Sequence, residues 1–149
     1  MAATLTAICV VVLSITLWTK RTRDRNKHEL ERHSIMPEAL HTLLASRQDV
    51  LVFDVRQPLD LFASSEIIPG ATRIAPIEVL ENPSLIPREK DSIVYCTCPS
   101  DKTSRAILHR ALALGFFRIK FLKGGLESWK AKGYPVEPYE ASIRLDTGT

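Results

Sequence analysis

Two cysteines that stand one residue apart are the clearest candidates for chemistry in this sequence. They are Cys96 and Cys98, in the stretch YCTCPSDKTS that covers residues 95–104. As a thiolate, either residue could attack a sulfane sulfur, hold it as a persulfide and pass it to an acceptor thiol. The two could instead oxidise together, although a disulfide within C-x-C is strained and easily reduced. The spacing alone therefore leaves both a nucleophile and a redox thiol switch open.

A metal centre is a third use of cysteines, and the sequence disfavours it. A zinc site would need two further ligands at a recognisable spacing. The four histidines, which are His28, His33, His41 and His109, show no such spacing to the pair. The third cysteine, Cys9, lies far away in an apolar segment, and the odd count argues against a secreted disulfide framework. We therefore expect no metal and no other cofactor.

Strands and helices alternate around the pair. Short apolar runs typical of buried strands stand at 49–55, 92–96 and 118–123, and helical patterns stand at 37–47, 104–115 and 126–132. This alternation predicts an α/β fold with a parallel sheet covered by helices on both faces. A parallel strand delivers its last side chain to the carboxyl edge of the sheet, where such folds place their sites. Cys96, at the end of SIVYC, is expected at that edge.

The residues after the pair should favour the thiolate. Thr103 or Ser104 is a good N-cap for the helix SRAILHRALALG. The free amides and the positive dipole end of that helix would then point back at the cysteines and lower a cysteine pKa from its free value of about 8.5. Lys102 adds a positive charge to the loop, whereas Asp101 opposes it.

Four segments together resemble the rhodanese, or sulfurtransferase, domain. They are VFDVRQPLDLF, IPGA, IVYC and FLKGGLESWKAKGYPV, and they occur in the family's order between residues 35 and 138. The resemblance implies a parallel sheet flanked by helices. It also implies transfer of sulfur from a sulfane-sulfur donor to a thiol acceptor through a cysteine persulfide.

The resemblance assigns the nucleophile in two ways. Counting from the strand IVYC makes Cys96 the match, with a loop two residues longer than usual and Cys98 as a companion thiol. Counting back from Ser104 makes Cys98 the match, but Pro99 then removes the first amide N–H of the loop. We favour Cys96 and keep Cys98 as the alternative.

The family pattern also suggests roles for other residues. Lys102, Thr103 and Ser104 correspond to the part of the loop that binds substrate, and a second set supports the loop structurally: Asp54, Arg56, Gly124 and Gly125. The usual loop contains a glycine and an arginine, and this one has neither. The difference disfavours thiosulfate as the donor and leaves open a catalytically silent interaction module.

The N-terminus predicts a membrane anchor. Residues 2–18 are 17 positions without a charge, and a basic cluster follows: Lys20, Arg21, Arg23, Arg25 and Lys27. This order predicts one transmembrane helix over 2–19 in contact with membrane lipid, with the rest of the chain in the cytoplasm. Outside the cluster the chain, of net charge +3, is close to neutral, so we expect no nucleic-acid partner.

The predicted organisation has four parts. A transmembrane helix over 2–19 precedes a basic juxtamembrane linker over 20–34, a rhodanese-like domain over 35–138 and a C-terminal tail over 139–149. The sequence does not identify a protein partner.

Overall fold

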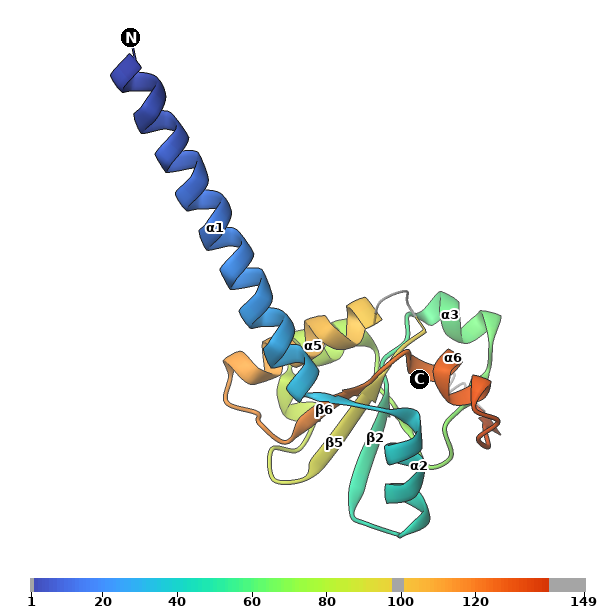
Figure 1. Cartoon of the computed structure of the whole chain (residues 1–149). Helices are drawn as coiled ribbons and strands as arrows, with labels where there is room; N and C mark the ends of the chain where they lie inside the picture. The colour runs from blue at the N-terminus through green and yellow to red at the C-terminus, as the bar shows by residue number, and fades with distance from the viewer. Residues whose placement is uncertain (1, 98–100, 140–149) are drawn as a thin grey trace, which may run out of the picture. The chain divides into compact units, whose positions relative to one another are not determined.

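The computed structural model describes residues 2–97 and 101–139 of the chain. The chain divides into two compact units, Met1–His33 and Ser34–Thr149. Figure 1 draws both units.

The first unit is a single helix, α1, over Ala2–Arg32. Its apolar side chains from Ile8 to Trp18 are exposed, and the hydroxyl of Ser14 donates to the carbonyl oxygen of Val10 at 2.7 Å. Within the described ranges, the structure contains no helix that combines the length and the apolar character needed to cross a membrane. The transmembrane helix predicted over 2–19 is therefore not supported. Its uncharged stretch is shorter than the roughly 20 residues of an ordinary span, and α1 continues through the basic residues that follow.

The second unit is built on a parallel sheet of five strands in the order β1-β6-β5-β2-β4. The strands are β1 (Ser34–Ile35), β2 (Val50–Asp54), β4 (Thr72–Arg73), β5 (Asp91–Tyr95) and β6 (Ile119–Leu122). The central pair, β2 and β5, is in register so that Asp54 lies opposite Tyr95. The predicted α/β fold with a parallel sheet is confirmed, and the strand that leads to Cys96 lies in its centre.

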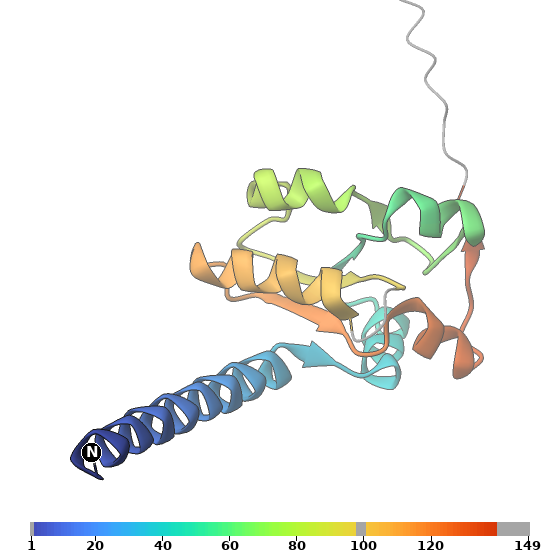
Figure 2. The ribbon, with the colours of Figure 1, turned by 90° about the horizontal axis from the view of Figure 1, so that it is seen from above.

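Helices cover both faces of this sheet (Figure 2). On one face lie α2 (Pro37–Ala45) and α6 (Gly125–Ala131), and on the other lie α4 (Pro76–Glu81) and α5 (Lys102–Ala113). The first face holds a core in which Leu40 and Trp129 pack with Val52, Ile93 and Leu122. Neighbouring strand residues point to the opposite face because side chains alternate along a strand.

Shorter elements complete the unit. They are α3 (Pro58–Ala63), the 3-10 turn η1 (Pro83–Leu85), and the strands β3 (Glu66–Ile67) and β7 (Glu137–Pro138). The last two pair antiparallel in a small second sheet that the sequence analysis did not predict. Two residues are too few for a recognisable apolar alternation, so only their tertiary pairing defines these strands.

Candidate active site at the carboxyl edge of the sheet

Cys96 follows the last residue of β5, as predicted, and is 1% exposed. Its carbonyl oxygen accepts a hydrogen bond from the backbone N–H of Leu126 in α6 at 3.1 Å. The backbone of Cys96 is therefore held by an element thirty residues away in the sequence. Cys98, the alternative nucleophile, lies outside the described residues.

The turn between β6 and α6 approaches Cys96 so closely that only glycine fits. Gly124 and Gly125 have φ angles of +74° and +54°, which side-chain-bearing residues rarely adopt. A Cβ atom on Gly125 would lie 1.9 Å from the carbonyl oxygen of Cys96 and 3.0 Å from its carbonyl carbon. The structure thus brings together the predicted support residue Gly125 and the predicted nucleophile Cys96.

The loop after Cys96 ends at Asp101, which is 5% exposed. Asp101 has a φ of +55° and is the N-cap of α5, so the helix begins at Lys102. Its Oδ2 accepts a hydrogen bond from the backbone N–H of Gly124 at 3.0 Å. The prediction that Thr103 or Ser104 caps the helix is therefore wrong. The left-handed backbone at Asp101, fixed by this tertiary contact, lets the helix start earlier.

The predicted substrate-binding residues occupy the first turn of α5. Lys102 is exposed, Thr103 is half-buried and Ser104 is fully buried. Within the described part of the chain, the buried Ser104 Oγ has no hydrogen-bond partner. A buried hydroxyl without a partner is costly, which makes this atom available to a bound group.

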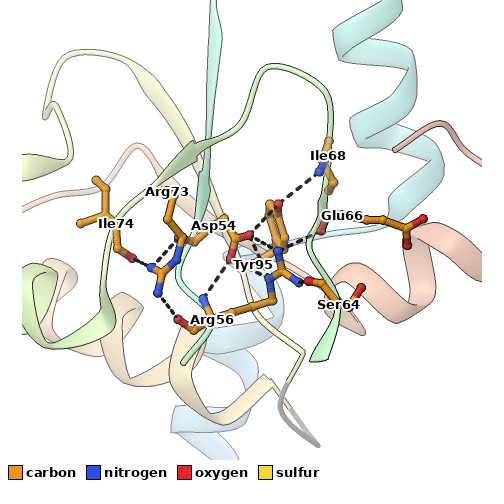
Figure 3. A network of polar contacts seen from close by, with 8 residues as sticks. All are labelled: Asp54, Arg56, Ser64, Glu66, Ile68, Arg73, Ile74 and Tyr95. Atoms are coloured by element: carbon orange, nitrogen blue, oxygen red, sulfur yellow. Dashed lines mark hydrogen bonds and ion pairs between the residues drawn. The ribbon is translucent and has the colours of Figure 1, made fainter. Parts of the chain in front are cut away.

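Asp54 and Arg56 form a fully buried ion pair at the end of β2 (Figure 3). The Arg56 Nε donates to both carboxylate oxygens of Asp54, at 3.0 and 2.9 Å, and Nη2 donates to Oδ2 at 2.6 Å. The same guanidinium donates to the carbonyl oxygens of Ser64 at 2.8 Å and Glu66 at 2.9 Å. Arg56 therefore supports the segment between α3 and β3, rather than the described part of the cysteine loop.

Tyr95, the residue directly before Cys96, is hydrogen-bonded to this ion pair. Its hydroxyl donates to Asp54 Oδ2 at 3.2 Å and accepts from the backbone N–H of Ile68 at 3.2 Å (Figure 3). Burial raises the pKa of the Tyr95 phenol well above its ordinary value, and the Asp54 carboxylate adds to this effect. The phenol therefore stays protonated and keeps donating.

Tyr95 and Arg73 are site residues that the sequence analysis missed. The guanidinium of Arg73 donates to the carbonyl oxygen of Arg56 at 2.7 Å and to that of Asp54 at 3.3 Å. The sequence contains a feature that could have identified Tyr95. It is the last residue of one buried strand, as Asp54 is of another, and the last residues of two strands paired in register are neighbours. No comparable pattern points to Arg73, which is the second residue of the two-residue strand β4.

Taken together, these contacts hold both the residue before Cys96 and the carbonyl group of Cys96 itself. Tyr95 before it is held by the buried ion pair, and the carbonyl of Cys96 is held by the turn at Gly125. Such an arrangement holds the backbone of Cys96 at the carboxyl edge of the sheet, where α/β folds place their sites.

The second unit matches known proteins in sequence. The model of one family, described as the rhodanese-like domain, matches residues 36–132. A protein of Allochromatium vinosum named sulfurtransferase is 29% identical over 104 residues, which cover 70% of this chain and 94% of that protein.

Solved structures agree with the sequence matches. A rhodanese-related protein from Thermoplasma volcanium is 27% identical with a TM-score of 0.57, and the match covers 70% of this chain and 97% of that one. A thiosulfate sulfurtransferase from Pseudomonas aeruginosa is 25% identical with a TM-score of 0.60. That match covers 78% of this chain but only 22% of the Pseudomonas chain.

Proposed function

The chain belongs to the rhodanese-like domain family, and from this premise we propose that it is a sulfurtransferase in which Cys96 carries the sulfur as a persulfide. Similarity to a named sulfurtransferase supports the reaction class. The observation that carries the choice of residue is the contact between the Cys96 carbonyl and the Gly125–Leu126 turn. It fixes one cysteine at the end of the central strand.

The reaction has two steps. The Cys96 thiolate attacks the outer sulfur of a sulfane donor, a new S–S bond forms, and the donor's own bond to that sulfur breaks with its electron pair. An acceptor thiolate then attacks the outer sulfur of the persulfide and releases the Cys96 thiolate. Sulfur is transferred and the enzyme is neither oxidised nor reduced overall.

The first turn of α5 supplies the groups that would stabilise these anions. The positive dipole end of α5 would favour a thiolate or persulfide anion on a cysteine close to it. The Ser104 Oγ, buried and unpartnered among the described residues, is available to donate to the sulfur or its leaving group. Thr103 and the exposed Lys102 complete the proposed binding surface.

Sulfur-transfer rates of three cysteine variants test the proposal. We expect Cys96→Ser to abolish transfer from a sulfane donor to a thiol, and Cys98→Ser to retain it in part. Cys9→Ser is the matched control, because Cys9 is exposed on α1 in the other unit.

Each contrary outcome has a defined meaning. Transfer that survives Cys96→Ser but not Cys98→Ser would move the nucleophile to Cys98. No transfer by the wild type with several donors would favour the silent interaction module. Loss of two hydrogens from the loop peptide under mild oxidant would support the redox thiol switch.

The location of the protein remains a prediction. It rests on the exposed apolar side chains of α1 and on the basic cluster that begins at Lys20, which predict contact with lipid and a cytoplasmic second unit. A reporter active only in the cytoplasm, fused to Thr149, should give signal. Signal only from a reporter that works outside the cytoplasm would contradict the prediction.

A further inference from the structure

Asp101 places a carboxylate near the backbone of Cys96, the proposed nucleophile. One point, the position of a Cβ on Gly125, lies 3.0 Å from the Cys96 carbonyl carbon and 3.6 Å from Asp101 Oδ1. The distance from Asp101 Oδ1 to the carbonyl carbon of Cys96 therefore cannot exceed the sum of these two distances. The carboxylate therefore lies close to the backbone of the residue to which a donor would bring its sulfur.

The carboxylate is fixed, and no described residue forms an ion pair with it. Its Oδ2 accepts from the backbone N–H of Gly124, and its backbone is held at a φ of +55°. Among the described residues, no lysine, arginine or histidine forms an ion pair with it. The neighbouring Lys102 is exposed, so water and salt screen its charge, whereas Asp101 is 5% exposed and is screened much less.

We propose that Asp101 selects the sulfur donor by charge. It disfavours dianionic donors such as thiosulfate, and it leaves monoanionic donors, organic persulfides and thiosulfonates, as the substrate class. The inference rests on the proposed function and specifies its donor. A second negative charge on a donor meets the buried carboxylate at short range, where repulsion is only partly reduced by solvent.

Two donors that differ by one charge provide the test. Thiosulfate and methanethiosulfonate both deliver their outer sulfur to a thiolate, and they release sulfite and methanesulfinate respectively. We compare kcat/KM for the two donors in the full chain and in Asp101→Asn. Asparagine also tolerates a positive φ, and its side-chain oxygen can still accept from Gly124. The variant therefore removes the charge and keeps the local structure.

We expect the wild type to prefer methanethiosulfonate, and Asp101→Asn to reduce that preference about tenfold. Asp49→Asn, an exposed acid that precedes β2 at the opposite edge of the sheet, should leave the preference unchanged. A structural defect would lower both rates together and leave their ratio intact. An unchanged ratio in Asp101→Asn would overturn the inference while the sulfurtransferase function stands. A wild type inactive with both donors would overturn both.

Discussion

Replacement of Gly125 by alanine should damage the site through the backbone of Cys96. The added Cβ would lie 1.9 Å from the Cys96 carbonyl oxygen. Because this oxygen is a backbone atom, it cannot move away by a side-chain rotation. Three effects add: a left-handed φ with a side chain costs about 1–2 kcal/mol, the lost hydrogen bond from Leu126 about 1 kcal/mol, and relief of the clash about 1 kcal/mol or more. We expect a loss of about 3–4 kcal/mol in the free energy of unfolding, together with loss of sulfur transfer.

Gly133→Ala is the matched control for this substitution. Gly133 also has a positive φ, +73°, but a Cβ there would meet no atom within 4 Å. It should therefore cost only the backbone strain, about 1–2 kcal/mol, and retain sulfur transfer. Urea denaturation of both variants measures the difference. Equal destabilisation of the two, with transfer intact in Gly125→Ala, would refute the close approach of the turn to Cys96.

Three further predictions concern the supports of the domain. Arg56→Met should lower the free energy of unfolding by about 3–5 kcal/mol, because it leaves the Asp54 carboxylate buried without a counter-charge; a loss below about 1 kcal/mol in urea denaturation would contradict the network. Trp129→Ala should cost about 3–5 kcal/mol by the same measurement, since the ring is buried in the core, and a near-neutral result would mean that it is exposed. The hydrogen bond from Lys132 holds the pKa of the Glu38 carboxyl below its ordinary value. The pair therefore stabilises the fold fully at a pH above the ordinary pKa of a glutamate. This stabilisation is lost as the pH falls through the lowered pKa of Glu38. Lys132→Met should raise the Glu38 pKa in an NMR titration, and an unchanged value would refute the pairing.

The apolar runs of the sequence predict the three longer strands of the main sheet well, but not the two-residue strands β1 and β4. The run at 92–96 corresponds to β5 (Asp91–Tyr95), and the run at 49–55 contains β2 (Val50–Asp54). Both strands are buried on two faces, so their composition is nearly continuous in apolar residues and does not depend on distant contacts. The position of Cys96 at the end of the central strand follows directly.

The sequence predicts the loop less well, because tertiary contacts determine it. The start of α5 depends on Asp101, whose conformation is tied to a hydrogen bond from Gly124, twenty-three residues later. The role of Tyr95 depends on its register with Asp54 across two strands. Local propensity favours Thr103 or Ser104 as the cap, and it carries no information on either of these long-range contacts.

The position of the persulfide within the chain tests the central claim most directly. Wild-type protein is treated with a sulfane donor, trapped with an alkylating reagent and digested, and the loop peptide that contains both Cys96 and Cys98 is fragmented in a mass spectrometer. We predict that the mass of one added sulfur atom appears on fragments that contain Cys96, and not on those that contain Cys98 alone. Added sulfur confined to Cys98, or no added sulfur on either residue, would contradict the assignment of Cys96 as the sulfur carrier.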